Sequence, residues 1–592
     1  MPCGALANIR MSAVRRGEGF TMDAFFNSIG EAVQQSAFCT GLAEALRFVF
    51  PLLTGFLLYR CARSLLFFKP EPEIWAWLAA PNGERIPVTH WENLLGRAKN
   101  CDVVLDYPTI SRQNAVLTRY DDGSWSISDV GSKGGVAVNG EGVSMSVVDF
   151  GDRIALGGVE FVLVPITPEQ ERIQASVRTR ADTGEHPWLT LTALTVFQLF
   201  ALLTLLAHGV SAAQAAPSML GLIALEWLLF GLYKLLRRSG FEVESLAFFL
   251  CTMGLCVIAS SDPSALTKEL LAIVMGVVFF IVLGLFLRNL ERVKRVRYLA
   301  AAFGIALLAF NLVFGVEKFG AKNWVQLGSF SFQPSELVKI CFVFAGASTL
   351  QRLMTRRNQF LFIAYSAAIC GCLALMSDFG TAIIFFCAFL VIAFLRSGDF
   401  ATLALACAGT GFAGVFVLRF KPYAMRRFAG WGHVWENSLT TGYQQTRAMM
   451  CIASGGLFGL GAGRGWLKYV GASDTDLVFA FVGEEWGLLM SLLLVAALVI
   501  LALFVIRSLP QSRSSFYSIG AAGAATILIV QAILNLFGTV DFLPLTGVTF
   551  PFVSNGGSSM LCVWGLLAFI KAVDTRQNAS FAIRLPGKEA CA

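Results

Sequence analysis

The sequence predicts a mainly α-helical bundle that crosses a membrane many times, with one small all-β domain near its N-terminal end. Hydrophobic residues make up 56% of the 592 residues and charged residues only 14%, whereas soluble domains carry roughly 25% charged residues. Apolar runs long enough to span a bilayer recur along most of the chain. One stretch, from about Glu73 to Pro165, breaks this pattern with short β-rich runs.

The N-terminal segment 1–36 is polar to weakly amphipathic, and we expect it to be poorly ordered. No cleavable signal peptide is evident, because Met1–Phe20 has no apolar core. A first transmembrane segment is expected at 37–69. Its apolar part is Ala37–Tyr59, and basic residues follow it.

Residues 73–166 are expected to form a small β-sandwich. Asp122-Gly123 and Asn139-Gly140 are strong hairpin-turn signals, and short strands at this spacing are typical of a sandwich. The predicted strands are Asp102–Leu105, Ala115–Tyr120, Trp125–Asp129, Gly135–Asn139, Arg153–Leu156 and Glu160–Val164. The charged segment 167–186 is expected to be a flexible linker.

After Pro187 the chain is expected to be membrane-embedded. It comprises two additional helices within 187–237, a main membrane domain at 238–574 and a C-terminal tail at 575–592. The apolar runs give about twelve spans besides the first. They lie near 187–208, 219–236, 241–260, 269–287, 297–316, 336–351, 359–376, 380–395, 401–418, 488–506, 516–537 and 553–570.

Basic residues orient these spans. They cluster in turns that fall on one side if the spans alternate, and by the positive-inside rule that side is cytoplasmic. We therefore expect the β-domain and the C-terminus inside the cell and segment 419–486 outside. Because the basic residues lie in such turns, the net charge of +7 indicates no nucleic-acid partner. The groups are Lys234, Arg237 and Arg238; Arg288, Arg292, Lys294, Arg295 and Arg297; Arg352, Arg356 and Arg357; Arg396; and Arg507 and Arg513.

Cysteine and histidine suggest no metal centre. Fourteen Cys are scattered, many inside apolar runs, without the paired spacing of a zinc site or a disulfide framework. The four His form no cluster, so no metal-ligating residue is predicted: His90, His186, His208 and His433.

Four carboxylates lie close together at the end of the long outer segment. Glu484 and Glu485 precede the apolar run Leu488–Ile506, and the positive end of a helix would favour both in its first turn. That does not account for Asp474 and Asp476, which lie upstream in a loop that could overhang the bilayer. We interpret Asp476 as a catalytic base.

Two more outer segments carry charge. Glu336 and Lys339 follow Pro334 and share one helical face. They either form a structural ion pair or line a polar cavity, since ionisable groups inside membranes usually mark functional paths. Asp378, in the run Ser377–Thr381, could simply cap the following helix.

Glycine is concentrated in Ser454–Gly465. The backbone amides there could cradle a diphosphate, with Arg464 and Lys468 adding charge, or the glycines could permit tight re-entrant packing. The run is no nucleotide P-loop, because the Gly-Lys-Ser/Thr ending is missing. A second run of small residues, Phe550–Ser559, leads into a predicted helix. Its small side chains could simply allow close helix packing.

Together these motifs resemble the SEDS family (FtsW/RodA/SpoVE) over about residues 241–572. The matching motifs are Gly-Ala-Lys-x-Trp, Gln-Pro-Ser-Glu-x-x-Lys, Asp-x-Gly-Thr, Gly-Tyr-Gln, Ser-Gly-Gly-x-x-Gly-x-Gly, Thr-Asp-x-x-Phe-Ala-x-x-Gly-Glu-Glu-x-Gly and Pro-Phe-Val-Ser-x-Gly-Gly-Ser-Ser. The resemblance implies a ten-span peptidoglycan glycosyltransferase that polymerises the undecaprenyl-diphosphate-linked disaccharide lipid II outside the cell. It also implies a class B penicillin-binding transpeptidase as partner.

The resemblance places the family's essential aspartate at Asp476, whereas Asp474 falls at a variable position. Residues of the matched motifs are expected to contact the substrate: Lys322, Glu336, Lys339, Gln444, Arg464, Glu484, Ser554 and Ser558. The chain departs from the family at Met376-Ser377, usually Gln-Pro, and at Asn555, usually aromatic. The spans at 187–208 and 219–236 exceed the family's ten, and Glu226 within them is assigned no role.

Glycan polymerisation needs a base that takes a proton from the attacking sugar hydroxyl, a contribution of roughly 10²–10⁴-fold. The leaving diphosphate needs positive charge from Lys339, Lys322, Arg464 or a divalent cation, Mg²⁺ or Mn²⁺. A lipid II flippase and a phosphorylation-reading scaffold with an inactive bundle are the alternatives. Transporters tend to place ionisable groups near the midplane of repeated halves, whereas here the charged motifs gather outside and no repeat is evident.

The β-domain resembles the forkhead-associated (FHA) domain, on the residues Gly96-Arg97, Ser111–Asn114 and Asp129–Gly140. The resemblance implies binding of a phosphothreonine-containing cytoplasmic protein and regulation by a Ser/Thr kinase pathway. An Arg and a hydroxyl suit a phosphate. Asn114 replaces the family's structural His, and Gly134 replaces the Asn that holds the peptide backbone. The alternative that the domain is a degenerate scaffold for binding other proteins therefore stays open. The implied phosphopeptide contacts are Arg97, Ser111, Arg112 and Asn139.

Overall fold

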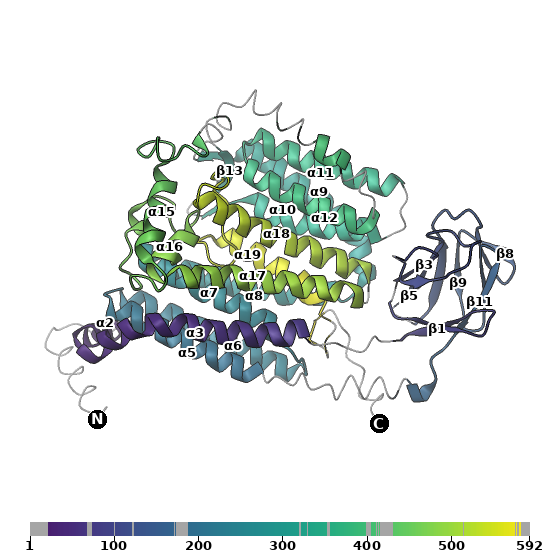
Figure 1. Cartoon of the computed structure of the whole chain (residues 1–592), viewed down its shortest axis with the longest axis horizontal. Coiled ribbons are helices and arrows are strands. Elements are labelled where there is room, and N and C mark those ends of the chain that lie inside the picture. Colours follow the sequence, from purple (N-terminus) through teal and green to yellow (C-terminus); the bar gives the residue numbers. More distant parts are fainter. Residues whose placement is uncertain are drawn as a thin grey trace.

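The computed structural model carries two units, a helical bundle and a β-sandwich (Figure 1). The described residues are 22–581, apart from 68–73, 91, 100, 121–122, 171, 173–186, 319–320, 328–329, 352–355, 398–403, 410, 412–413, 415–424, 426–429, 513, 575 and 577–578. Most of the predicted linker, most of the tail 575–592 and most of the span 401–418 therefore lie outside the described residues.

Most of the other predicted spans coincide with apolar helices, whereas the span predicted at 336–351 is a helix that is not among the membrane-spanning candidates. Eight described helices are long and apolar enough to cross a membrane, and Phe360–Leu375, Phe379–Leu395 and Gly557–Ala572 are shorter apolar stretches. The helices are α2 (Met22–Gln35), α3 (Ala37–Phe67), α5 (Pro187–Ala207), α6 (Ala212–Leu235), α7 (Glu242–Ser261), α8 (Leu266–Leu287), α9 (Leu290–Phe314), α10 (Pro334–Gln351), α11 (Arg356–Leu375), α12 (Phe379–Ser397), α15 (Tyr443–Gly455), α16 (Val478–Glu485), α17 (Leu488–Ser508), α18 (Ser515–Thr539) and α19 (Gly557–Ala572). Short 3₁₀ turns are η1 (Pro263–Ala265), η2 (Leu467–Tyr469) and η3 (Leu509–Gln511).

The prediction that residues 1–36 are poorly ordered is wrong for Met22–Gln35, which form helix α2. Its helical spacing brings apolar side chains such as Phe26 and Val33 onto one face, where they pack against the bundle core. A short segment that buries such a stripe is stabilised by the packing, not by its own propensity.

The N-terminal helices form a layer on one side of the bundle. Helix α3 packs against α5 and α17, α5 against α7, and α6 against α8; Figure 1 shows this layer beneath the rest of the bundle. Helix α7 is enclosed on all sides, with its whole span buried. The core of the bundle therefore extends without a break from the N-terminal helices to α19.

The β-sandwich has two sheets, with strand orders β2-β1-β11-β10-β7-β8 and β4-β3-β5-β6-β9. Its core includes Leu95, Trp125, Ile127, Ile154 and Phe161, all at most 2% exposed. The strands are β1 (Ala76–Ala79), β2 (Arg85–Val88), β3 (Glu92–Gly96), β4 (Val103–Val104), β5 (Ala115–Arg119), β6 (Trp125–Asp129), β7 (Val136–Val138), β8 (Glu141–Gly142), β9 (Met145–Val148), β10 (Arg153–Leu156) and β11 (Val159–Val164). The predicted sandwich is confirmed, and the sequence reading missed β1, β2, β3, β8 and β9.

A third sheet lies in the bundle, between α9 and α10. Strands β12 (Val316–Lys318), β13 (Ala321–Leu327) and β14 (Phe330–Phe332) pair antiparallel in that order. The sequence reading assigned no strands here. Ala321, Lys322 and Trp324 of the Gly-Ala-Lys-x-Trp motif lie on β13, which contacts α10.

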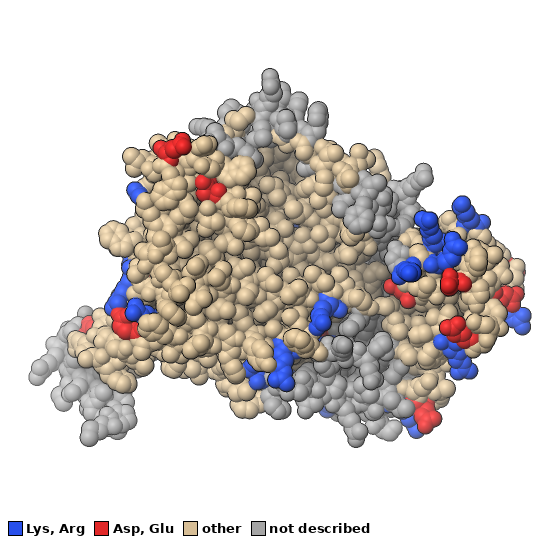
Figure 2. Space-filling model, in the orientation of Figure 1, with Lys and Arg blue, Asp and Glu red and all other residues tan. Residues whose placement is uncertain are grey.

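The two ends of the bundle differ. Helices α2, α15 and α16 lie at one end, and the β-sandwich lies beyond the other (Figure 1). A hydrogen bond of 2.7 Å joins His90 Nε2 of the sandwich to the Pro510 carbonyl at that second end. Charged side chains are sparse on the face of the bundle in Figure 2 and dense on the sandwich, as expected if the bundle is surrounded by lipid.

Candidate functional site

Asp476 lies in the turn between η2 and α16, at the end of the bundle opposite the β-sandwich. The turn is closed by the Asp476 N–H, which donates to the Ala472 carbonyl at 2.9 Å, and Ala472 has a positive φ of 59°. The Asp476 side chain is half-buried. Its Oδ2 faces Gly547, where a methyl group added to the backbone would lie 3.3 Å away.

The segment Thr546–Ser559 holds this turn from the other side. Ser554 Oγ donates to the Thr475 carbonyl at 2.6 Å. Asn555 binds Asp474 twice, from its side chain to Oδ2 at 2.8 Å and from its N–H to the carbonyl at 2.9 Å. Ser554, predicted to contact the substrate, thus positions the residue beside Asp476, and Asp474 is engaged in the same anchoring.

Asn535 of α18 is a site residue that the sequence reading missed. Its Nδ2 donates to the carbonyls of Asp476 at 3.0 Å and Val548 at 2.9 Å, so it joins the two segments that flank the Asp476 carboxylate. Gln531, one turn earlier and fully buried, has no hydrogen-bond partner for its side chain among the described residues. Two amides four residues apart in an apolar helix share one face, and that spacing was the available signal.

Glu484 and Glu485 do not lie in the first turn of α17, so that interpretation is wrong. They end helix α16, and Gly487, with φ of 92°, separates them from α17. Both are 1% exposed. Glu484 accepts hydrogen bonds of 2.8 Å from the N–H groups of Trp466 and Leu467.

Glu485 is held in the same way. It accepts from the N–H groups of Gly463 at 2.8 Å and Gly465 at 3.3 Å, and from Ser260 Oγ at 2.8 Å. Burial raises the pKa of Glu485 to about 7, against the lowering effect of these bonds and of Lys468. The amide cradle predicted for a diphosphate is therefore occupied by protein carboxylates, as the tight-packing alternative expected.

The two cations of this segment are also engaged. Arg464 pairs with Glu44 of α3, and Lys468 Nζ donates to the Gly463 carbonyl at 2.8 Å. Gln444, another predicted substrate contact, donates from Nε2 to the Gly471 carbonyl at 2.9 Å and so supports the turn that leads to Asp474. The structure gives all three a role in shaping the outer loop.

A second polar cluster surrounds Asp378. Its Oδ1 accepts from the Thr381 N–H at 3.1 Å, which confirms the predicted helix cap. Its Oδ2 accepts from Asn323 Nδ2 at 3.1 Å and Gln333 Nε2 at 3.3 Å, and the Gln333 N–H donates to Ser558 Oγ at 3.4 Å.

Two contacts fix this cluster in place. Lys322 Nζ, on β13, donates to the Leu312 carbonyl at 2.8 Å. Gly380 packs so closely on Thr546 and Val548 that an added methyl group would lie 2.8–2.9 Å from their side chains. The segment Thr546–Ser559, which faces Asp476 at Gly547, therefore also contacts the helix start that carries Asp378.

Glu336 and Lys339 form the ion pair that the sequence allowed. Lys339 Nζ lies 2.6 Å from Glu336 Oε1, and the two residues are 1% and 4% exposed. Glu336 Oε2 has no hydrogen-bond partner among the described residues. Within the described part of the chain, no group of three or more His, Cys, Asp or Glu is arranged to hold a metal ion. A divalent cation therefore finds no ready-made group of three such ligands among the described residues.

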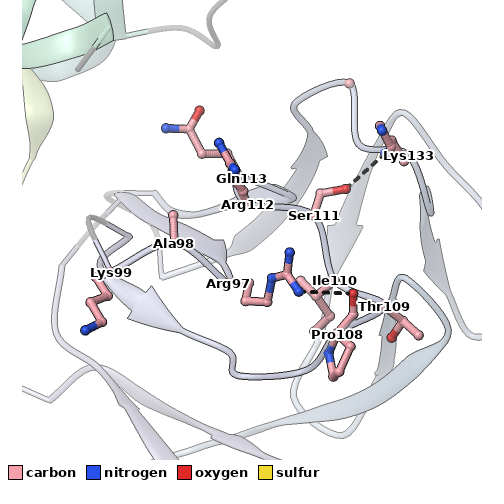
Figure 3. Close-up of a pocket in the computed structure, with 11 residues that line it drawn as sticks. Arg97, Ala98, Lys99, Pro108, Thr109, Ile110, Ser111, Arg112, Gln113 and Lys133 are labelled. Carbon is pink, nitrogen blue, oxygen red and sulfur yellow. Dashed lines mark hydrogen bonds between the residues drawn. The ribbon is translucent and has the colours of Figure 1, made fainter. Parts of the chain in front are cut away.

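The β-sandwich carries a separate basic pocket of about 1050 Å³, at the loops that follow β3, β4 and β6. Figure 3 shows Arg97 and Ser111 on its wall, with Lys99, Arg112 and Lys133 around them. Ser111 Oγ accepts from the Lys133 N–H at 3.0 Å, and Arg97 Nη1 donates to the Pro108 carbonyl at 3.5 Å. Three of the four predicted phosphopeptide contacts therefore meet in one pocket.

Asn139 is the exception. It lies at the other end of β7, with a φ of 52°, and its side chain binds Asp152 and the Arg153 N–H. Gly134 faces Gly157 so closely that an added methyl group would lie 2.6 Å from the Gly157 Cα. This backbone cannot accept an Asn at 134, so the FHA residue that holds a peptide backbone has no counterpart here.

Comparison with known proteins gives two family matches. A model described as a cell cycle protein, FtsW/RodA/SpoVE, matches residues 245–579. A model of the cytoplasmic domain of the inner membrane component of type III secretion systems matches residues 80–167. The peptidoglycan glycosyltransferase RodA of Mycobacterium tuberculosis is 30% identical over 335 residues, which cover 52% of this chain and 70% of the relative.

Solved structures resemble each unit. A chain from a peptidoglycan synthase complex, described as coordinating polymerization and crosslinking, is 25% identical with a TM-score of 0.48. The match covers 56% of this chain and 97% of that one. An FHA domain studied for phosphothreonine-dependent interactions is 22% identical with a TM-score of 0.15, over 16% of this chain and 98% of that domain.

Proposed function

The chain belongs to the FtsW/RodA/SpoVE family, and we propose that it is a peptidoglycan glycosyltransferase that polymerises lipid II. The observation that carries this proposal is Asp476, a half-buried carboxylate held by Asn535, Ser554 and the Asp474–Asn555 pair at one end of the bundle. The matched region contains every one of these residues.

In the proposed reaction, the Asp476 carboxylate takes the proton from a sugar hydroxyl of one lipid-linked chain. The hydroxyl oxygen then forms a bond to the anomeric carbon of the other. The bond from that carbon to the diphosphate oxygen breaks, and its electron pair leaves with the polyprenyl diphosphate. A positioned general base contributes roughly 10²–10⁴-fold to such a step.

The leaving diphosphate needs a nearby positive charge. Lys339 and Arg464 are paired with Glu336 and Glu44, whereas the bond of Lys322 is to a backbone carbonyl. We therefore favour Lys322 among the three predicted cations. A divalent cation would have to take ligands from the substrate diphosphate as well as from the protein.

We place the Asp476 end of the bundle outside the cell. By the positive-inside rule the opposite end is cytoplasmic, because Arg237 and Arg238 lie there in the turn after α6 and Arg507 in the last turn of α17. A lipid-linked substrate then keeps its polyprenyl tail in the bilayer while its head group reaches the outer site. A class B penicillin-binding transpeptidase is the partner that we propose for crosslinking the product.

A lipid II flippase is the alternative. Incubation of the purified full chain with labelled lipid II, in detergent and in vesicles with a co-expressed transpeptidase, separates the two. Glycan chains would support the enzyme, translocation without chains would support the flippase, and neither product would contradict both.

We propose that the β-sandwich regulates this activity by binding phosphothreonine on a cytoplasmic protein. Arg97, Ser111 and the surrounding Lys99, Arg112 and Lys133 supply the charge and the hydroxyl that a phosphate requires. Because Gly134 cannot hold the peptide backbone, selectivity for the residues around the phosphothreonine is expected to be weak.

The test is binding of a phosphothreonine peptide library to the full chain. Arg97→Ala should weaken binding about 10–100-fold, the loss expected for a charged hydrogen bond of about 1.5–3 kcal/mol. Arg153→Ala, on the exposed surface of the same domain, is the control and should bind as the wild type does. Equal binding by both variants, or binding of unphosphorylated peptides, would contradict the assignment.

A further inference from the structure

Helices α3 and α5 lie outside the region that the family model matches, yet they contact the outer loop of that region. The contacts gather on Leu457–Gly465, the glycine-rich loop. They come from the end of α3 that lies near α15 and α16 and from the residues that follow α5.

The polar part of this contact centres on Glu44. Its carboxylate pairs with Arg464 of the glycine-rich loop, and His208 Nε2 lies 3.9 Å from the same carboxylate. His208 Nδ1 also lies 2.8 Å from the Ala462 carbonyl. At Gly461 an added methyl group would lie 2.9 Å from the His208 ring, so the loop backbone is pressed against the N-terminal helices.

Aromatic side chains extend the same contact. The Phe48 ring lies 4.9 Å from that of Phe458, and the Phe50 ring lies 4.9 Å from that of Trp486. Thr54 Oγ1 reaches Met490 Sδ at 3.6 Å. One face of α3 therefore follows the outer loop from the glycine-rich segment to the start of α17.

The glycine-rich loop is connected to the candidate base by a short path. The Gly463 and Gly465 amides of the loop bind the Glu485 side chain, and the Trp466 amide, directly after the loop, binds that of Glu484. These two glutamates end helix α16. Helix α16 begins directly after Asp476 and Leu477, and it is buried along its whole length. A shift of the loop would therefore move a rigid helix that carries Asp476 at its other end.

We propose that the Glu44–Arg464 pair is a positioning device, by which α3 fixes the glycine-rich loop and, through α16, the Asp476 carboxylate. This proposal rests on the proposed function of Asp476, and it gives Arg464 a role other than substrate binding. Both partners of the pair are about half exposed, and exposed ion pairs contribute little to global stability. Loss of the pair is therefore expected to affect turnover and loop motion, not unfolding.

The test compares four variants of the full chain in lipid II polymerisation. Glu44→Gln and Arg464→Gln should each lower kcat about 3–10-fold with KM within about twofold, since a misplaced reactive group costs rate when binding is intact. The swap of Glu44→Arg with Arg464→Glu should restore kcat to within about twofold. Glu436→Gln is the control, because it removes an exposed charge of the same loop region that pairs with His433, not with Glu44 or Arg464.

Two outcomes would overturn the proposal. If Arg464→Gln raises KM and the swap does not restore it, Arg464 binds the substrate. If all four variants match the wild type, the pair positions nothing.

Hydrogen exchange of residues 456–476 gives a readout that does not depend on turnover. The two single variants should exchange at least about threefold faster there, and the swap should exchange as the wild type does. Unchanged exchange in the single variants contradicts the proposal even if the wild type polymerises nothing. Faster exchange with no polymerisation by the wild type would support the positioning role and overturn the proposed function alone.

Discussion

Two pairs of carboxylates lie at the two ends of helix α16 and have opposite environments. Glu484 and Glu485 are 1% exposed, and backbone N–H groups bind their oxygens. Asp474 and Asp476 are half-buried in a turn, and the Asp476 carboxylate faces a glycine. Similar acidic residues therefore have different surroundings: backbone amides hold the two glutamates, whereas Asp476 is the half-buried carboxylate that we propose as the base.

The difference follows from what surrounds each pair. A glycine-rich segment can approach a carboxylate with several amides at once, because it has no side chains to keep the backbone away. Gly463 and Gly465 do this for Glu485. Around Asp476 the neighbouring segments contribute side chains that bind backbone carbonyls instead, as Asn535 and Ser554 do, so they hold the turn through its backbone.

The largest effect on folding is expected at Glu484. Glu484→Ala leaves the buried N–H groups of Trp466 and Leu467 without partners, at about 1–3 kcal/mol each. We expect the free energy of unfolding to fall by about 2–6 kcal/mol, measured by denaturation in detergent. Glu436→Ala removes an exposed outer-loop acid and should change nothing. Equal stability of the two variants would break the contrast between the carboxylate pairs.

A smaller effect, on rate, is expected at Asn535. Asn535→Ala removes both bonds that join Asp476 to the Val548 segment. Each is worth about 0.5–1.5 kcal/mol, so kcat for polymerisation should fall about 10-fold, with at most a modest loss of stability. Asn437→Ala, an exposed amide in the outer loop, is the control. A kcat equal to that of the wild type would show that the turn holds Asp476 without Asn535.

The smallest effect concerns Glu485 and pH. Burial raises its pKa from 4.5 to about 7, so the native state retains a proton that the unfolded chain releases in this interval. Stability should therefore fall as the pH rises from about 5 to 7, by at most about 1.4 kcal/mol per pH unit. In thermal unfolding, the stability of Glu485→Gln should not show this fall between about pH 5 and 7. Identical slopes in both proteins would mean that Glu485 is ionised throughout.

Much of the fold could be predicted from the sequence, because membrane spans and sandwich strands are encoded locally. Apolar runs gave the spans, and β6 and β10 have the predicted bounds. The three-stranded sheet β12–β14 was missed because its strands lack an alternating apolar pattern. Helix α2 was missed because its stability comes from packing on α5 and α6.

The candidate site was predicted less completely. The cap at Asp378 was found from its motif, since a helix cap depends on local sequence, and the role of Asp476 as the base stays a prediction. The positions of Glu484 and Arg464 depend on long-range contacts with Trp466 and Glu44, which no local pattern records. Glu484 and Glu485 were assigned to the wrong helix because Gly487 ends α16 only through its left-handed conformation.

The most direct test of this account is polymerisation of labelled lipid II by Asp476→Asn beside Asp474→Asn. Asp474→Asn keeps an oxygen for Asn555 and should polymerise within a few-fold of the wild type. Asp476→Asn should unfold as the wild type does and lose roughly 10²–10⁴-fold in kcat, the contribution of a general base. Wild-type polymerisation by a folded Asp476→Asn protein would contradict the assignment of Asp476 as the base.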